Sequence, residues 1–254
     1  MFEGKKVLIL GVANKKSIAW AITEALVKNG AKVALTYANE AIEKRVRPLA
    51  ESIQCENVYE CDVQSDEQID KLFVDLKNDF GNLDAVVHSV AFANKEDLAN
   101  DFSETTRAGF TMALDISAYS LIAVARGAKS LMNEGGSIIT LSYLGAVRVV
   151  DNYNVMGVAK AALESSVRYL AADLGRTNIR VNAISAGPIK TLAASGIPKF
   201  RELLNNFAEM SPLKRNVELE DVANTAMFLL GHLGSGVTGE VIYTDCGFSQ
   251  MGTA

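Results

Sequence analysis

The sequence predicts an α/β fold in which helices flank both faces of a doubly wound, seven-stranded parallel sheet. Short apolar or β-branched runs alternate with longer stretches of helical periodicity along the whole chain. Of its 254 residues, 49% are hydrophobic and 22% are charged, and this balance suits one large core. No repeat, low-complexity tract or Pro/Ser-rich linker interrupts the pattern, so we expect a single domain over residues 1–254.

Seven short runs are strand candidates. The first, at residues 6–10, is apolar but far too short to cross a membrane, and the start of the chain shows no cleavable signal pattern. Because longer helical segments separate the runs, we expect the strands to be parallel. The other candidates lie at residues 32–37, 58–61, 85–88, 137–141, 180–184 and 240–244.

Helical periodicity is clear at residues 18–28, 67–80 and 153–174. Asn29-Gly30 and Gly81 are expected to end the first two of these helices. The least regular segment covers residues 190–212. We expect a flexible substrate-binding flap at about residues 191–210, and a plain surface excursion is the alternative.

Charge and cysteine usage exclude several classes of protein. A formal charge of −5 and an isoelectric point near 5.2 argue against a nucleic-acid or anionic-membrane binder, which needs a concentrated positive surface. Cys55, Cys61 and Cys246 form no CxxC pair, and their odd number suits reduced thiols in the cytoplasm. His88 and His232 are the only histidines, so we expect no metal site.

The turn after the first strand candidate leads into the helix that begins near Ile18. In dinucleotide-binding folds this turn binds a pyrophosphate, because free backbone N–H groups and the positive helix end attract it. The usual three-glycine pattern is missing, since Ser17 and Ala19 stand where glycines are expected after Gly11. By motif alone, an ordinary strand-to-helix connection is an equal alternative.

Three further turns lie at the carboxyl ends of predicted strands, the edge where open parallel sheets bind ligands. Asp62 could accept a hydrogen bond from an adenine amine, or it could cap the helix that follows Ser65. The small residues after His88 allow close approach of a ligand or tight helix packing, and we interpret His88 itself as a packed histidine. Thr191 offers a hydroxyl for a carboxamide or a phosphate.

Tyr153 and Lys160 limit the chemistry most. They stand seven residues apart, almost two helical turns, so both side chains share one helix face, about 10 Å apart along the axis. Tyr143 precedes Tyr153 by ten residues. A proton-donating phenol and a positive charge could serve one substrate and cofactor. In the alternative interpretation, the tyrosine lies at the edge of the core and the lysine is a solvated charge, both on one amphipathic helix.

The order of these pieces resembles the Rossmann-like short-chain dehydrogenase/reductase superfamily, and specifically its bacterial NADH-dependent enoyl-acyl-carrier-protein reductases. Ordinary superfamily members have a tyrosine four residues before the lysine, where this chain has Met156, and a serine thirteen residues earlier, where it has Tyr143. A tyrosine pair thus replaces the ordinary pair. The similarity spans nearly the whole chain and is most specific at residues 11–19, 141–145, 152–160 and 180–194.

This resemblance implies reduction of the trans-2 double bond of enoyl thioesters, the final step of each fatty acid elongation cycle. It implies that Tyr153 hydrogen-bonds the thioester oxygen, that Lys160 holds the nicotinamide ribose and that Tyr143 positions the acyl group. Ala93 is the implied substrate contact. The implied cofactor contacts are Gly11, Ser17, Ile18, Asp62, Val63, Val90, Lys160, Ile189, Thr191, Leu192 and Ala193.

NADH is the expected cofactor. Ala38 follows the second strand candidate, where a polar side chain often meets the adenosine, and neither Asn39 nor Glu40 suits a 2′-phosphate. Lys44 and Arg45 come about one helical turn later, so NADPH is the less favoured alternative.

The resemblance also implies partners, namely an acyl carrier protein bearing the enoyl chain and further copies of this chain in a homotetramer. Carrier proteins are acidic, so Lys199 and Arg201 could guide docking, although exposed charges need no such purpose. Apolar flap residues could line an acyl channel or could pack the flap onto the body; these are Leu192, Ile197, Phe200, Leu203 and Leu204.

Two other functions stay open at this point. One is a carbonyl-reducing or hydroxyl-oxidising dehydrogenase, because this fold hosts many substrates, and the other is a noncatalytic nucleotide sensor. Met156 at the ordinary tyrosine position disfavours the first. The presence of Tyr153 together with Lys160 disfavours the second.

Overall fold

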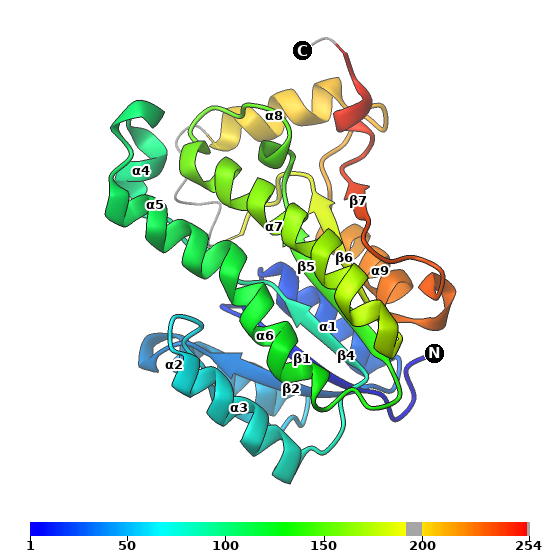
Figure 1. Ribbon diagram of the computed structural model, residues 1–254. Helices are drawn as coiled ribbons and strands as arrows, with labels where there is room; N and C mark the ends of the chain where they lie inside the picture. The colour runs from blue at the N-terminus through cyan, green and yellow to red at the C-terminus, as the bar shows by residue number, and fades with distance from the viewer. Residues whose placement is uncertain (192–199, 253–254) are drawn as a thin grey trace.

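The computed structural model, which describes residues 1–191 and 200–252, contains the predicted seven-stranded, all-parallel sheet (Figure 1). Its strand order is β3-β2-β1-β4-β5-β6-β7, so the winding direction reverses between β1 and β4. In such sheets, ligands bind outside the carboxyl ends of the strands at the reversal. The strands are β1 (Lys6–Leu10), β2 (Lys32–Tyr37), β3 (Val58–Glu60), β4 (Ala85–His88), β5 (Gly136–Ser142), β6 (Ile179–Ala186) and β7 (Val241–Thr244).

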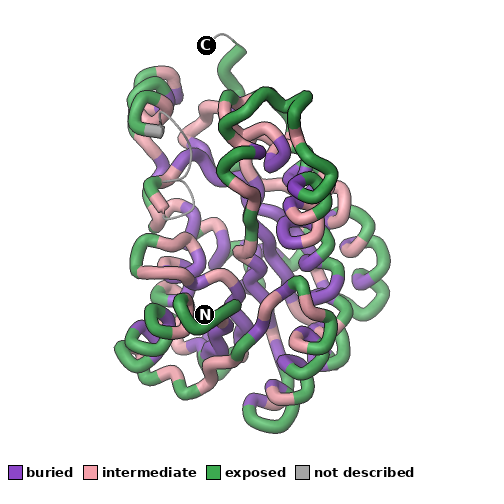
Figure 2. Tube along the Cα trace, turned by 90° about the vertical axis from the view of Figure 1, so that its left-hand side faces the viewer, coloured by how far each residue is buried: buried purple, intermediate pink, exposed green. Residues whose placement is uncertain are grey.

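Helices cover both faces of the sheet because successive side chains of the central strands enter two different cores. In β1, Leu8 and Leu10 enter one core and Val7 and Ile9 enter the other. Figure 2 shows these buried strands between helices whose outer faces are exposed. One layer contains α1 (Ile18–Lys28), α2 (Glu40–Ser52) and α9 (Leu219–Leu230), and the opposite layer contains α3 (Asp66–Asp79), α6 (Ser120–Lys129) and α7 (Asn154–Leu174).

The predicted helix at 18–28 is confirmed as α1, which ends at Asn29 and Gly30 as expected. Gly30 and Gly81 both have positive φ, +92° and +81°, which suits their position just after a helix. The predicted start of α7 is wrong by one residue, because Tyr153 precedes the first helical residue.

Several other boundaries differ from the prediction by one or two residues. The helix predicted at 67–80 spans Asp66–Asp79, because the Ser65 hydroxyl accepts a hydrogen bond from the Gln68 backbone and sets the helix start. Strands β5 and β6 extend beyond 137–141 and 180–184, since they pair with each other from Gly136 to Ser142. Strand β3 ends one residue earlier than predicted, and β7 begins one residue later.

A helical stretch from Arg107 to Lys129 joins β4 to β5. It consists of α5 (Arg107–Leu114), a π-helical turn (Asp115–Tyr119) and α6. Among the described residues it is the one stretch long and apolar enough to cross a membrane. Its most apolar 18-residue window has a mean hydropathy of 1.5, but 56% of this window is buried inside the protein. A core helix passes the same test, and α6 supplies much of the core beside β4 and β5.

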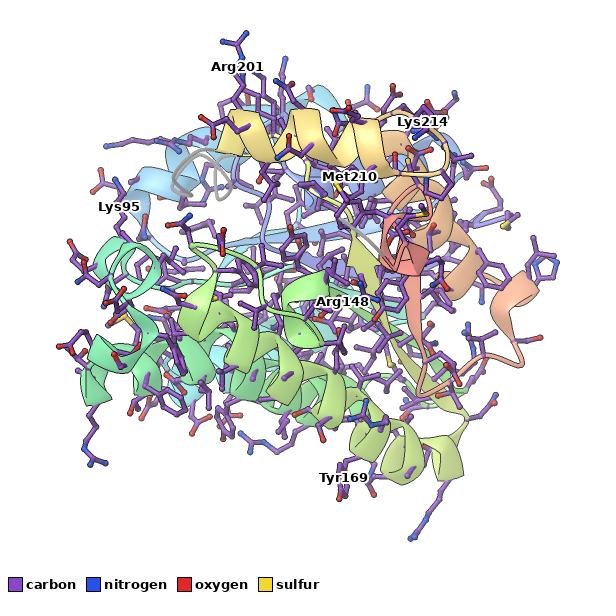
Figure 3. All side chains as sticks on the ribbon, turned by 90° about the horizontal axis from the view of Figure 1, so that it is seen from above. Lys95, Arg148, Tyr169, Arg201, Met210 and Lys214 are labelled. Atoms are coloured by element: carbon purple, nitrogen blue, oxygen red, sulfur yellow. The ribbon has the colours of Figure 1, made fainter. Side chains whose placement is uncertain are left out.

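The predicted flap contains one described helix, α8 (Phe200–Met210), which lies at the top of the molecule in Figure 1. Phe207 is buried and stacks on Phe248, with ring centroids 4.6 Å apart. This contact anchors α8 to the segment that follows β7, while Arg201 projects into solvent (Figure 3). Residues 192–199, and with them four of the flap residues predicted to have a role, lie outside the described chain; these are Leu192, Ala193, Ile197 and Lys199.

Candidate active site

The backbone on both sides of Tyr153 adopts the left-handed region. Asn152 and Asn154 have φ of 60° and 36°, values that asparagine tolerates better than most residues. The Asn154 side-chain amide donates hydrogen bonds to the carbonyl oxygens of Leu98 and Asn100, at 3.0 and 2.7 Å. These bonds tie the start of α7 to the end of α4 (Lys95–Ala99) and thereby fix the position of Tyr153.

Tyr143 and Tyr153 contact each other edge to face, with ring centroids 4.9 Å apart and planes inclined at 68°. Gly145 lies against the Tyr153 ring, since a Cβ atom there would come within 2.4 Å of it. Burial raises the pKa of Tyr143 to about 12. Burial and the neighbouring Tyr143 also raise the pKa of Tyr153. Both phenols therefore keep their protons at neutral pH and can donate hydrogen bonds.

Lys160 is almost fully buried, and its ammonium group donates a hydrogen bond to the carbonyl oxygen of Leu141 at 2.7 Å. Leu141 lies two residues before Tyr143, so this bond fastens α7 to the strand end that carries the tyrosine. Burial lowers the pKa of Lys160 to about 8, and the charge of Glu164 opposes this shift. The structure thus brings Tyr143, Tyr153 and Lys160 together at the carboxyl end of β5, while their chemical roles stay predictions.

Met156, at the ordinary tyrosine position, is a packing residue here. It is 6% exposed and forms a small apolar cluster against which both Tyr153 and Ala93 pack. Ala93, the predicted substrate contact, therefore lies in the neighbourhood of the tyrosine pair. The other members of the cluster are Ala113, Val155 and Ala159.

The turn after β1 has the features that a pyrophosphate site needs. Gly11 has φ of +98°, and a Cβ atom there would lie 2.0 Å from the Ser89 carbonyl oxygen, so only glycine lets the ends of β1 and β4 approach this closely. The Ser17 hydroxyl donates to the carbonyl oxygen of Asn14 at 2.6 Å and does not cap α1. The first turn of α1, which begins at Ile18, can therefore offer backbone N–H groups to an anion.

Asp62 and Val63 follow the end of β3, with Cys61 between the strand and Asp62. The Asp62 carboxylate accepts a hydrogen bond from the Gln64 backbone at 3.0 Å, whereas Ser65 caps α3. The alternative in which Asp62 caps this helix is therefore wrong, and its carboxylate stays at the strand end where an adenine amine could donate to it. Val63 is 6% exposed and packs in the core, so a cofactor could contact its backbone rather than its side chain.

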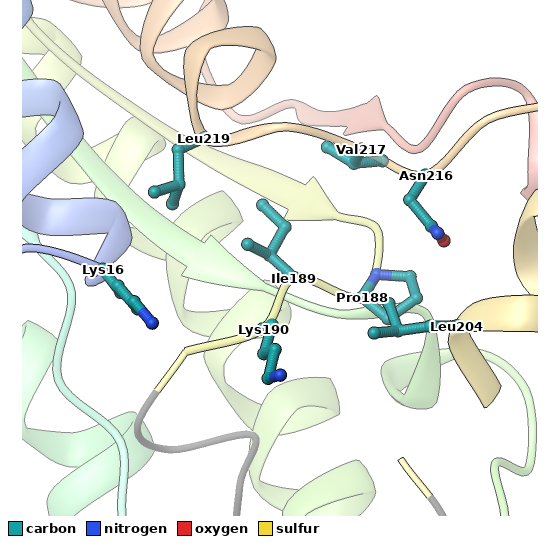
Figure 4. A pocket seen from close by; sticks show the side chains of 8 residues that line it. All are labelled: Lys16, Pro188, Ile189, Lys190, Leu204, Asn216, Val217 and Leu219. Atoms are coloured by element: carbon teal, nitrogen blue, oxygen red, sulfur yellow. The ribbon is translucent and has the colours of Figure 1, made fainter. Parts of the chain in front are cut away.

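Beyond β6 the chain passes through Ile189 to Thr191, whose backbone N–H donates to the Ile189 carbonyl oxygen at 2.8 Å. Ile189 lines a cavity of about 350 Å³ between this turn, the turn after β1 and α8 (Figure 4). Leu192 and Ala193, the last two predicted cofactor contacts, lie outside the described residues. The other residues that line the cavity are Lys16, Pro188, Lys190, Leu204, Asn216, Val217 and Leu219.

His88 is a structural residue, as the sequence indicates. It is fully buried, and its ring nitrogens bond the hydroxyls of Thr140 at 2.9 Å and Ser120 at 2.8 Å. Burial lowers the pKa of His88 to about 3, and the charge of Lys160 acts in the same direction. The imidazole is therefore neutral. Val90, a predicted cofactor contact, follows two residues later and is partly buried against the core.

The end of β2 lacks the usual polar residue. Ala38 is exposed there, and the next side chain, Asn39, caps α2 by accepting a hydrogen bond from the Ile42 backbone at 3.1 Å. Lys44 forms an ion pair with Glu40 at 2.6 Å. This cation therefore already has a carboxylate partner on its own helix, which favours a cofactor without a 2′-phosphate.

Two contacts near the site were not predicted. The Ser142 hydroxyl donates to the buried carboxylate of Glu164 at 2.6 Å. Ser117, in the π-helical turn, accepts from the Phe92 backbone at 3.0 Å and holds the segment that leads to Ala93. Glu164 follows Lys160 by one helical turn, and that spacing could have indicated it. The π-helical turn leaves no comparable signal in the periodicity of the sequence.

Comparison with known proteins decides the family. A family model described as enoyl-(acyl carrier protein) reductase matches residues 11–249. The chain belongs to this enoyl reductase family. The NADH-dependent enoyl-[acyl-carrier-protein] reductase FabI of Rickettsia bellii is 51% identical over 253 residues, which cover 100% of this chain and 97% of that protein. The Bacillus cereus enzyme of the same name is 50% identical, with 99% of both chains covered.

Solved structures of such reductases have the same fold. The Bacillus cereus enoyl-acyl carrier protein reductase, in a complex with NADP+ and indole naphthyridinone, superposes with a TM-score of 0.97 at 50% identity and full coverage of both chains. The Anaplasma phagocytophilum reductase, in a complex with NAD, gives 0.96 at 51% identity, with 99% of this chain and 96% of that chain covered. The predicted family and the Rossmann-like fold of this enoyl reductase are thereby confirmed.

Proposed function

We propose that this enoyl reductase uses NADH to reduce the trans-2 double bond of enoyl thioesters carried by an acyl carrier protein, with Tyr143, Tyr153 and Lys160 as its catalytic residues. The observation that carries this assignment is the convergence of two protonated phenols and a buried ammonium at the carboxyl end of β5. An ordinary carbonyl reductase would instead need a phenol at the position of Met156, which is packed in an apolar cluster.

NADH, when bound, supplies a hydride to C3 of the enoyl thioester. Negative charge then develops on the thioester oxygen, and a proton must be taken up at C2. The Tyr153 hydroxyl, which keeps its proton because burial raises its pKa, donates a hydrogen bond to that oxygen. Tyr143 packs edge-on against Tyr153 and positions the acyl group beside it. Lys160 holds the nicotinamide ribose.

The other predicted cofactor residues that the structure describes would hold a dinucleotide across the carboxyl ends of the strands. Gly11, Ser17 and Ile18 belong to the turn suited to the pyrophosphate. Asp62 and Val63 would contact the adenine. The backbone of the segment after β4 and of the turn after β6 would contact the nicotinamide half, through Val90, Ile189 and Thr191.

The partners and location are part of the same proposal. Arg201 of α8 projects into solvent and could attract an acidic carrier protein (Figure 3). Leu204 lines the cavity beneath α8, consistent with a flap that covers the acyl chain. We further propose a cytoplasmic homotetramer that binds neither nucleic acid nor membrane, and light scattering in solution would test the number of subunits.

An absorbance assay tests the reaction. NADH oxidation is followed with a trans-2-enoyl thioester and, as a matched control, with a 3-ketoacyl thioester of the same chain length. We expect oxidation with the enoyl substrate only. Turnover of the keto substrate alone would instead identify a carbonyl reductase, and binding of NADH without turnover of either would identify a nucleotide sensor.

A further inference from the structure

Two neighbouring residues at the end of β5 are each held by α7. The Leu141 carbonyl oxygen accepts a hydrogen bond from the Lys160 ammonium at 2.7 Å, and the Ser142 hydroxyl donates to the Glu164 carboxylate at 2.6 Å. Lys160 and Glu164 lie one helical turn apart, and the next residue of the strand end is Tyr143. We call these two hydrogen bonds the β5–α7 clamp.

Both charged members of the clamp are shielded from water, at 6% exposure each. No salt bridge joins Lys160 and Glu164 in the described chain. Their charges nevertheless interact, over a distance longer than that of an ion pair. Burial favours the neutral form of both groups, and each opposite charge favours the charged form of its neighbour. Removal of one charge would therefore leave the other less stable in its ionised form.

We propose that Glu164 is a positioning residue of this reductase, whose carboxylate keeps the Lys160 ammonium charged and, through Ser142, holds the strand end from which Tyr143 projects. Glu164 touches neither substrate nor cofactor in this assignment and acts only through its two neighbours. The inference rests on the proposed role of Lys160, in which its ammonium group holds the nicotinamide ribose.

The other groups near the clamp cannot take over this task. Arg168, one turn further along α7, is a cation and lowers the pKa of Glu164, as Lys160 does. His88 in β4 is neutral, and Tyr143 keeps its proton. Tyr243 in β7 has a raised pKa, partly because of Glu164, and is also uncharged at neutral pH. Among the residues that the structure describes, Glu164 is thus the negative group that acts on Lys160.

The test is the pH profile of kcat/KM for the enoyl thioester at saturating NADH. In Glu164→Gln the amide oxygen can still accept from Ser142, but the charge is lost, so Lys160 should lose its proton more easily. We expect the alkaline limb to move to lower pH by roughly half a unit or more. Glu134→Gln, which removes an exposed charge from the turn before β5, should leave the limb in place. An unmoved limb in Glu164→Gln would overturn the proposal.

Glu164→Asp separates the two tasks and also covers the case in which the glutamine variant fails to fold. Its shorter side chain keeps the charge but cannot reach Ser142 in the same geometry. We expect the alkaline limb to stay at the wild-type pH while kcat falls severalfold. A limb that moves as far in Glu164→Asp as in Glu164→Gln, or a wild-type kcat in Glu164→Asp, would contradict the proposal.

Lys160→Met distinguishes a failure of this inference from a failure of the proposed function. If that variant keeps both wild-type NADH affinity and the wild-type alkaline limb, the role assigned to Lys160 is wrong. If it loses them while Glu164→Gln retains the wild-type profile, Lys160 acts as proposed and only the positioning role of Glu164 is rejected.

Discussion

The two ends of the proposed cofactor site are built differently. At the nicotinamide end, Tyr153 and Lys160 are held by residues of another element, namely by the ring of Tyr143 after β5 and by the carbonyl oxygen of Leu141 in β5. At the adenosine end, Asp62 is only partly buried, and its carboxylate bonds a backbone group two residues away.

The difference indicates that the two ends have different tasks, catalysis at the nicotinamide end and cofactor binding at the adenosine end. In the proposed mechanism, the groups that meet developing charge are immobilised by packing, so they need not be reorganised during the reaction. Groups that only hold the adenosine can rely on local turns and on water. Substitutions at the nicotinamide end should therefore change kcat or stability, and substitutions at the adenosine end should change cofactor affinity with little effect on kcat.

The largest effect is expected for Tyr153→Phe. If its hydroxyl is the principal donor to the thioester oxygen, kcat should fall about 100- to 1,000-fold, the usual loss for one such donor. The Kd for NADH, measured by fluorescence, should stay unchanged. The control is Tyr169→Phe, which removes a phenol that is 77% exposed on α7, the helix that follows Tyr153 (Figure 3). Wild-type turnover in Tyr153→Phe would rule out the assigned role.

The next effect concerns stability at the nicotinamide end. Burial lowers the pKa of Lys160 from its ordinary 10.5 to about 8, so between these pH values the unfolded chain binds more protons than the folded one. The free energy of unfolding of the wild type should therefore rise with pH across this window. Below pH 8 the buried amine is charged, so the whole cost of burying the charge lowers the stability of the folded protein. At 1.36 kcal/mol per pKa unit, that cost is about 3 kcal/mol.

Urea unfolding of the wild type and of Lys160→Met, measured from pH 7 to above pH 10, checks this expectation. The stability of the variant relative to the wild type should be greatest at pH 7 and should decline as the pH rises. Lys129→Met, at the exposed end of α6, is the matched control and should show no such trend. A pH-independent difference between wild type and Lys160→Met would mean that the buried amine does not titrate in this range.

The same contrast explains what the sequence could predict. Strand candidates and the position of α1 follow from local periodicity, and the spacing of Tyr153 and Lys160 is readable because one helix carries it. The bond between Ser142 and Glu164 depends on how α7 lies across the end of β5, which local patterns do not encode. The start of α3 differs from the prediction by one residue because the Ser65 side chain caps the helix.

At the adenosine end, Asp62→Asn should weaken NADH binding without slowing the bound enzyme. The asparagine oxygen can still accept from the adenine amine, but the bond loses its charged acceptor, which costs about 1 kcal/mol, or roughly a fivefold rise in Kd. Asp70→Asn, an exposed substitution on α3, is the control. A large fall in kcat with unchanged Kd would contradict the division between the two ends.

The smallest effect is expected for Ala38→Arg. The exposed position after β2 would then carry a cation where a 2′-phosphate is expected, and an exposed ion pair contributes about 0.2 to 1 kcal/mol. We expect kcat/KM for NADPH to rise up to about fivefold at low salt, with the gain lost at high salt because the pair is screened. Ala38→Gln adds length without charge and should not favour NADPH. If both variants favour NADPH equally, side-chain contact rather than charge selects the cofactor at this end.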